Sequence, residues 1–327
     1  MPARKFSFPG WLLLLAISLP LLVLLHLNTG PATVSILSAI ADLINDRASI
    51  DSIIFLEVRL PRALLAATIG ASLALSGAAL QGMLHNPLAS PGLLGITQTA
   101  ALAAVLTLYF GLANAAWFIL PVAAMGGALL AVMIILLLAG RYSSILSIIL
   151  IGIAINAMSG SFTSLALNYA PDAYAMQEIF FWMLGSVANR SMNELFFALP
   201  FMLLGWALIF SQARFLTAMT LGEASARSLG FNINLSRWLI IVGVASCTGA
   251  SVAVSGNISF IGLVVPHLMR PLVGHDPGRL LWASGIGGAC LLLLSDIAVQ
   301  LLSTGQELQL GVITAAIGGP FFLYLIL

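Results

Sequence analysis

The sequence predicts an all-α integral membrane protein with about ten transmembrane helices, and its composition is the first reason. Of the 327 residues, 61% are hydrophobic and 7% are charged, and the mean hydropathy is +1.10. A soluble globular chain carries about a quarter charged residues. The 12 Lys and Arg and 11 Asp and Glu residues are too few to cover a water-facing surface. This composition excludes a cytosolic enzyme, and it excludes a nucleic-acid binder, which needs a dense basic face.

Long unbroken apolar runs, such as residues 117–140, indicate helices and not the strands of a membrane barrel. Transmembrane strands alternate apolar and polar residues over about ten positions, whereas a spanning helix needs about 20 mostly apolar residues. Gly, Pro, Asn and charged residues divide the chain into the segments 10–29, 60–82, 92–111, 115–139, 144–168, 192–210, 234–255, 257–270, 280–303 and 309–327. Because the eighth segment is short and contains Pro266, we expect it to be broken or not to span fully.

The basic residues favour an orientation with both termini in the cytoplasm. With the N-terminus inside, eight Lys and Arg residues fall on the cytoplasmic side and four, namely Arg47, Arg59, Arg62 and Arg190, on the other side. Acidic residues have the opposite distribution, which gives net charges of +6 inside and −4 outside. Asp296 remains within the ninth segment, where an ionisable group is costly and is either functional or tightly paired.

An internal repeat relates the second and seventh segments. The string GASLALSG at 70–77 recurs as GASVAVSG at 249–256, and a proline follows ten residues later in both copies, at Pro87 and Pro266. The copies are offset by five helices, an odd number, so they run in opposite directions, as in the inverted repeats of transporters. Small residues also let helices approach closely in lipid, so chance recurrence in Gly-rich helices is the alternative explanation.

A long polar segment, 30–58, precedes the second span on the outer side. Residues 33–43 predict a short amphipathic helix on the membrane surface. The second span is then expected to begin at Arg59-Leu60-Pro61-Arg62, because Pro is favourable in the first turn of a helix. Arg59 and Arg62 either snorkel to the interface or form a docking point for an acidic partner.

Two polar segments interrupt the apolar pattern on the inner side. The loop 85–92 holds two prolines and a glycine, with Gln81, Asn86 and Gln98 around it; it is an ordinary turn or a cytoplasmic closure that lines a cavity. In the second segment, 221–231, Glu223 and Arg227 are spaced as a helical ion pair, and Gly230 predicts the helix end. So short a helix is unstable alone, so it either docks into a partner or is a solvated loop helix.

Motifs for catalysis, nucleotide binding or metal binding do not occur in the sequence. The four histidines lack the HExxH spacing, and there is no GxxxxGK[ST] or GxSxG string. We therefore predict no enzymatic activity, no cofactor and no metal site. Cys247 and Cys290 lie in apolar runs and are expected to pack as small hydrophobic residues.

The motifs together resemble the FecCD family, the permease subunits of type II ABC importers for iron–siderophore, haem and vitamin B12. The matching strings cover roughly residues 55–327 and are long and specific. They are RLPR at 59–62, GASLALSG at 70–77, QG at 81–82, NPLASPGLLG at 86–95, LGEASARSLG at 221–230 and GNISFIGLVVPH at 256–267.

This resemblance implies a vitamin B12 permease-like fold in the bacterial inner membrane and a set of partners. These are a second permease subunit in a homo- or heterodimer, two cytoplasmic ABC ATPase subunits that hydrolyse ATP, and a periplasmic substrate-binding protein. The chain is then one permease domain, 1–327, with repeat halves at about 60–168 and 234–327 and a cytoplasmic coupling segment at about 219–232.

The resemblance also assigns roles to single residues. The residues that it implies contact the ATPases are Leu221, Gly222, Glu223, Ala224, Ser225, Ala226, Arg227, Ser228, Leu229 and Gly230. Docking of the binding protein falls to Arg59 and Arg62, and the cytoplasmic gate to Asn86, Leu88, Ser143 and Ser144. Two departures bear on docking: Gln300 replaces a third docking arginine of the vitamin B12 permeases, and Gln309 replaces a proline before the last helix.

The function predicted from these motifs is ATP-driven import of an iron–siderophore chelate. Haem or vitamin B12 as cargo is the alternative within the family. An alternative of another class is a secondary transporter driven by an ion gradient, with Asp296 as its coupling site.

Overall fold

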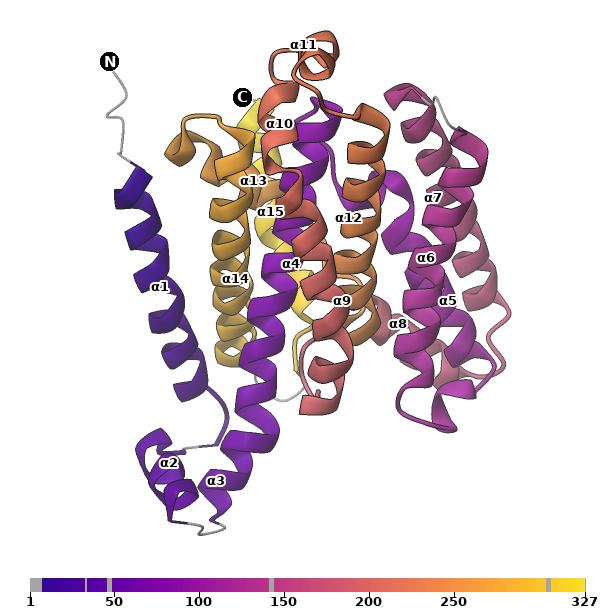
Figure 1. Ribbon diagram of the computed structural model, residues 1–327. Helices are drawn as coiled ribbons and strands as arrows, with labels where there is room; N and C mark the ends of the chain where they lie inside the picture. Colours follow the sequence, from indigo (N-terminus) through magenta and orange to yellow (C-terminus); the bar gives the residue numbers. More distant parts are fainter. Residues whose placement is uncertain (1–7, 33, 46–48, 141–143, 304–306, 327) are drawn as a thin grey trace.

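The computed structural model describes residues 8–32, 34–45, 49–140, 144–303 and 307–326, and the regular elements in these ranges are helices (Figure 1). Helices coincide with all the predicted segments, with ends that differ by a few residues. They are α1 (Phe8–Asn28), α4 (Leu60–Leu84), α5 (Ile96–Tyr109), α6 (Ile119–Ala139), α7 (Ile145–Asn168), α9 (Met192–Ser211), α12 (Ile233–Ser255), α13 (Ile261–Met269), α14 (Pro277–Leu302) and α15 (Leu310–Ile326). The all-α membrane fold is thereby confirmed.

The described chain contains more helices than the ten predicted, because short ones connect the long ones. The short α-helices are α2 (Ile36–Ile44), α3 (Ile50–Ile54), α8 (Ala173–Leu184), α10 (Ala213–Met219) and α11 (Glu223–Ser228). Single turns are η1 (Phe55–Arg59), η2 (Pro91–Leu94), η3 (Leu112–Asn114) and η4 (Arg270–Val273). By length and composition, six described helices can cross a membrane, and α1, α5, α13 and α15 contain shorter apolar stretches.

The second span starts earlier than predicted. Helix α3 begins at Ile50 behind a capping box in which Ser49 and Ser52 exchange hydrogen bonds. It continues through the π-helical turn η1 into α4, so that the helix is continuous to Leu84. Pro61 therefore follows a wide turn instead of opening a helix. A proline inside a helix lacks one N–H and clashes with the preceding turn, and a π-turn is one way for a helix to accommodate such a break.

Glycines of the repeated string bring helix backbones into direct contact. A Cβ added at Gly288 of α14 would lie 2.2 Å from the carbonyl oxygen of Gly70 in α4. A Cβ at Gly77 would lie 1.7 Å from the carbonyl oxygen of Gly262, at the start of α13. In the second copy, a Cβ at Gly249 would meet Ala128 of α6 at 2.6 Å. Small residues thus fix how closely α4 and α12 pack against their neighbours.

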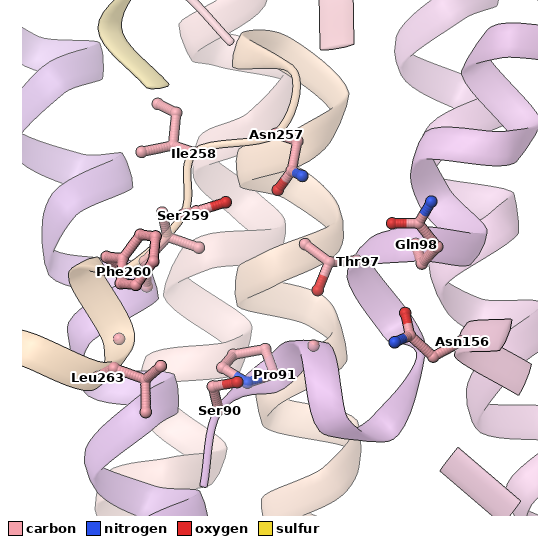
Figure 2. A pocket seen from close by; sticks show the side chains of 13 residues that line it. Ser90, Pro91, Thr97, Gln98, Asn156, Asn257, Ile258, Ser259, Phe260 and Leu263 are labelled. Carbon is pink, nitrogen blue, oxygen red and sulfur yellow. The ribbon is translucent and has the colours of Figure 1, made fainter. Parts of the chain in front are cut away.

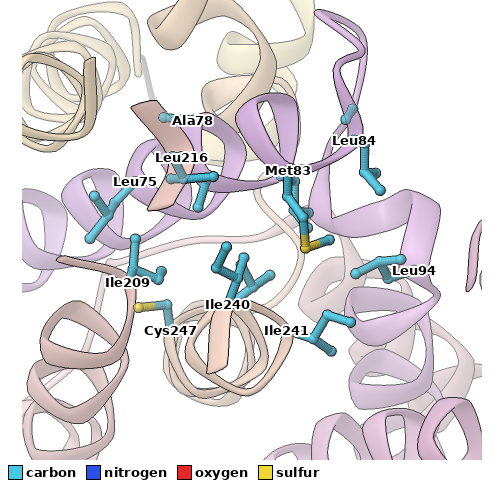
Figure 3. Packing of buried hydrophobic residues seen from close by; sticks show 14 of the residues in the cluster. Leu75, Ala78, Met83, Leu84, Leu94, Ile209, Leu216, Ile240, Ile241 and Cys247 are labelled. Carbon is cyan, nitrogen blue, oxygen red and sulfur yellow. The ribbon is translucent and has the colours of Figure 1, made fainter. Parts of the chain in front are cut away.

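The core of the bundle lies around α4 and α12. Figure 3 shows Ile240, Ile241 and Cys247 of α12 facing Leu75 and Met83 of α4, all of which are buried. Cys247 is completely buried and Cys290 is 9% exposed. Both thiols lie within the apolar packing, as the sequence predicts.

The two ends of the bundle carry different elements. Helices α10 and α11, the start of α1 and the end of α15 lie at one end, and α2 and α3 at the other (Figure 1). We call these the α11 end and the α2 end. Helix α4 runs toward the α11 end and α12 runs away from it. The contacts also come in pairs that correspond to each other in the repeat. Helix α4 packs on α14 as α12 packs on α6, and α5 packs on α6 as α13 packs on α14. An inverted repeat produces such pairs, and the boundaries of its halves stay a prediction.

The Gly70–Gly288 contact yields a stability test. Gly288→Ala should destabilise the bundle by about 1–3 kcal/mol, because its methyl group has no room against α4. Gly285→Ala, on the same helix, places its methyl group in open space and is the matched control. We expect a lower melting temperature in detergent for Gly288→Ala alone. Equal melting of both variants would contradict the close contact.

Candidate functional site

The segment 221–230 forms an exposed projection at the α11 end (Figure 1). Eight of its ten residues are exposed and only Ala226 is buried. Leu221 and Leu229 are 68% and 62% exposed, although their side chains are apolar. Exposed apolar side chains around a short helix are typical of a surface that a partner covers.

The ends of α11 are fixed by glycines with left-handed backbone angles. Gly222 has φ +90° and precedes the helix, and Gly230 has φ +89° and follows it. The N–H of Phe231 donates to the carbonyl of Ala226, and the N–H of Gly230 donates to that of Arg227. These two bonds form a Schellman motif, which is the helix end that Gly230 predicts.

An ion pair between an exposed glutamate and a buried arginine joins α11 to the long helix α12. The guanidinium of Arg237, in the first turns of α12, donates to the carboxylate of Glu223. Arg237 is 6% exposed, whereas Arg227 is exposed to solvent. The predicted Glu223–Arg227 pair therefore does not form, because a buried guanidinium needs a counter-charge more than an exposed one does. The pair thus connects α11 directly to α12.

The inner loop contacts the helix that leads into α11. His85 has φ +51°, and its Nε2 lies 2.9 Å from the carbonyl oxygen of Met219 in α10. Asn86 accepts a hydrogen bond from the N–H of Leu88 at 2.9 Å, and Leu88 is 56% exposed. The structure thus places the predicted gate residues Asn86 and Leu88 beside the predicted coupling segment.

The second predicted gate stretch is not joined to this loop by any hydrogen bond among the described residues. Ser144 is the N-cap of α7 and accepts a hydrogen bond from the N–H of Ser147 at 3.1 Å. Its hydroxyl therefore has a local structural role. Ser143 lies outside the described residues.

Asp296 is the centre of a buried polar network at the α2 end. Its carboxylate accepts hydrogen bonds from Arg62 Nε at 2.7 Å, Arg62 Nη2 at 2.9 Å and Gln300 Nε2 at 2.9 Å, and it lies 2.7 Å from His26 Nε2. Asp296 is 1% exposed, so these partners replace the water that it loses on burial. The network joins α1, α4 and α14, and it makes Asp296 a tightly paired residue.

The two arginines with a predicted docking role make contacts inside the protein. Arg59 is 6% exposed and donates to the carbonyls of Leu27 and Ala32. A cation near the C-terminal end of a helix, here α1, is favoured by the helix dipole. Arg62 is shared between Asp296 and Glu307 and its side chain is 13% exposed. Neither arginine extends freely to the interface.

Gln300 and Arg190 are two further polar residues at the α2 end. The amide nitrogen of Gln300 donates to Asp296 and lies 3.2 Å from His26 Nε2, so the residue in place of a third arginine supports the network. Arg190 lies in the loop before α9, outside the spans. Burial lowers the pKa of its guanidinium, and nearby Glu194 opposes that change.

Sequence reasoning did not anticipate the roles of His26 and Arg237. His26 is 270 positions from its partner Asp296, and no local pattern connects the two. Arg237 had one usable signal, because it is a single charge at the beginning of a long apolar run. Such a residue near a span end suggests a buried ion pair as readily as interfacial snorkelling.

Comparisons with known proteins show which family the whole chain resembles. The model of the FecCD transport family matches residues 15–327. The hemin transport system permease protein of Yersinia pestis is 37% identical over 96% of this chain and 95% of its own length. The vitamin B12 import system permease protein of Vibrio parahaemolyticus is 35% identical over 96% and 93%. A solved ABC transporter described as metal-chelate type and inward-facing superposes with a TM-score of 0.87, at 30% identity, over 98% and 99% of the two chains.

The Asp296 network predicts a large difference between two carboxylates that contact the same arginine. Asp296→Asn should cost about 3–5 kcal/mol of stability, because it leaves the largely buried Arg62 without its fully buried counter-charge. Glu307→Gln is the control and should cost less than about 1 kcal/mol, because that carboxylate is partly solvated. The melting temperature of the detergent-solubilised protein measures both. Similar melting temperatures for the two variants would contradict the role of Asp296.

Proposed function

Because the chain belongs to the FecCD transport family and is the permease of an ABC importer, we propose that it carries an iron–siderophore chelate across the bacterial inner membrane. Related proteins are named for hemin, vitamin B12 and metal chelates. These cargoes share one chemistry, a metal held by a bulky organic ligand. The iron–siderophore chelates belong to the same class, and haem and vitamin B12 are the competing cargoes.

The exposed helix α11 is the observation that carries the mechanism. We propose that two cytoplasmic ATPase subunits bind a permease dimer through this helix, and that these subunits hydrolyse the nucleotide. The Glu223–Arg237 pair transmits a movement of α11 to α12. The contact between Met219 and His85 transmits it to the loop of Asn86 and Leu88. Nucleotide binding then shifts the population between states that are open to opposite sides.

This assignment sets the sides of the membrane. The α11 end, with the start of α1 and the end of α15, is proposed to face the cytoplasm. The α2 end then faces the periplasmic binding protein. A partner carboxylate can compete there with Glu307 for Arg62, while Arg59 supports the same surface from within. Ser143 and Ser144 remain proposed gate residues at the cytoplasmic end.

A charge swap tests the coupling role of the Glu223–Arg237 ion pair. Glu223→Arg should lower uptake per ATP hydrolysed by about tenfold or more, since it places two cations together, and Glu223→Arg with Arg237→Glu should restore most of it. Ser164→Ala is the control, because Ser164 lies on α7, away from α11, and its hydroxyl bonds only within its own helix. The measurement is paired uptake and ATP hydrolysis in proteoliposomes that hold the whole transporter. Failure of the double variant to recover, with normal assembly, would contradict the transmission through this pair.

A panel of ligands tests the proposed cargo. The permease is reconstituted with its ATPase and binding protein and offered a ferric tris-hydroxamate, a ferric catecholate, haemin and cyanocobalamin. We expect ATP-dependent uptake of a ferric siderophore at a rate at least about tenfold above haemin and cobalamin. Preference for haemin or cobalamin would show that the proposed iron–siderophore cargo is wrong. Uptake by the permease alone on a proton or sodium gradient would overturn the mechanism.

A further inference from the structure

Two interrupted spans meet at a half-open cavity on the side of the bundle, where Asn156 is exposed. Helix α5 has 14 residues and follows the turn η2, and α13 has nine residues and follows the stretch 256–260. Between the two interruptions lies a cavity of about 270 Å³, which we call the junction cavity. Figure 2 shows Asn257 and Ser259 on one side of it, with Thr97 and Asn156 facing them.

The junction cavity lies half-way through the membrane-spanning region. Its lining includes Leu73, which lies within the span that ends at Leu84. It also includes Asn156, which is the twelfth of the 24 residues of α7. Backbone that is not helical is tolerated at this depth only where protein buries it or where it lines a watery cavity.

The polar side chains that line the junction cavity make no hydrogen bonds within the part of the chain that the structure describes. Six of the lining residues have amide or hydroxyl side chains, and no hydrogen bond joins these side chains to another part of the described chain. The six are Ser90, Thr97, Gln98, Asn156, Asn257 and Ser259.

Other polar side chains in the spans behave differently. Thr68 donates to the carbonyl of Leu64 at 2.8 Å, Ser161 to that of Ala157 at 2.9 Å, and Thr248 to that of Val244 at 2.7 Å. The usual outcome in this chain is thus a bond to the same helix. Polar groups at mid-membrane depth that lack such a bond are costly unless water or a ligand satisfies them.

The backbone beside the cavity is strained. Phe260 has φ +68°, a left-handed conformation that is unfavourable for a bulky side chain. This turn ends the stretch of Asn257 and Ser259 and starts α13. Strain of this kind persists only where the surrounding structure imposes it, and it clusters at functional sites.

From these observations we propose that the junction cavity is a mid-membrane subsite that hydrogen-bonds the uncharged, oxygen-rich edge of the transported chelate. The lining offers both donors and acceptors and no charged side chain, so it suits neutral carbonyl, hydroxamate and hydroxyl groups. A charged group would lose its water there without gaining a counter-charge. A volume of about 270 Å³ is below that of a whole-ligand site, so the cavity holds one edge of the cargo. This inference rests on the proposed function.

Variants of two lining residues on different helices test the subsite. Gln98→Met with Asn156→Leu keeps side-chain size and removes the hydrogen bonds. We expect uptake of a neutral ferric tris-hydroxamate by the whole transporter in proteoliposomes to fall by at least about tenfold, because each lost bond costs roughly fivefold. Ser161→Ala, on α7 like Asn156, is the control and should leave uptake unchanged, because Ser161 bonds only to its own helix. Unchanged uptake by the double variant would overturn the subsite and leave the proposed function intact.

A labelling experiment gives an answer that does not depend on transport. Ser259→Cys should react with a small hydrophilic thiol reagent, whereas the native Cys247 and Cys290 are buried. A ferric tris-hydroxamate should slow the labelling at least about fivefold, by occupying the cavity. Labelling at the same rate with and without the chelate would overturn the subsite, even if the double variant fails to assemble. If the unmodified transporter takes up no ferric siderophore, both the proposed cargo and the subsite are wrong.

Discussion

A polar group inside a lipid bilayer must find its partners within the protein, because the hydrocarbon region holds no water to replace them. This constraint explains most of the polar contacts in the spans. Hydroxyl groups bond back to their own helix, as Thr68 and Thr248 do. The carboxylate of Asp296 is surrounded by donors from three helices. Single buried hydroxyls such as those of Ser76 and Ser284 also lack a partner among the described residues, but the junction cavity gathers six such polar side chains around one space, and this is why it is the strongest candidate for a ligand.

The second constraint is the close approach of helices without a hydrophobic driving force between them. Contacts between Gly70 and Gly288 and between Gly77 and Gly262 bring backbone against backbone. They leave no room for adjustment at those points, so α4, α13 and α14 hold fixed positions relative to one another. The strained turn at Phe260 sits next to this rigid crossing, which supplies the support that such a turn needs.

Hydropathy alone predicted the course of the chain, because every spanning helix needs a continuous apolar run. The positions of α6, α7, α9 and α12 follow from this within a few residues. It could not predict that the second span is continuous from Ile50, because the π-turn before Pro61 has no signature in the sequence.

Of the candidate site, the sequence predicted the exposed helix and its glycine end but not its partner within the chain. A spacing of four residues suggested Glu223 and Arg227, whereas burial decides in favour of Arg237. Pairings across long separations, such as that of His26 with Asp296, depend on which helices become neighbours, and a single sequence does not contain that information. The junction cavity is of the same kind, since its polar residues come from four separate stretches.

Helices α10 and α11 occupy the connection between the proposed halves 60–168 and 234–327 and belong to neither. The contacts of Gly70 with Gly288 and of Gly77 with Gly262 join the two proposed halves, so a displacement of α10 and α11 acts on one packed bundle. The exposed residues of α10 and α11 can therefore change to fit a different partner without changes in the spanning helices.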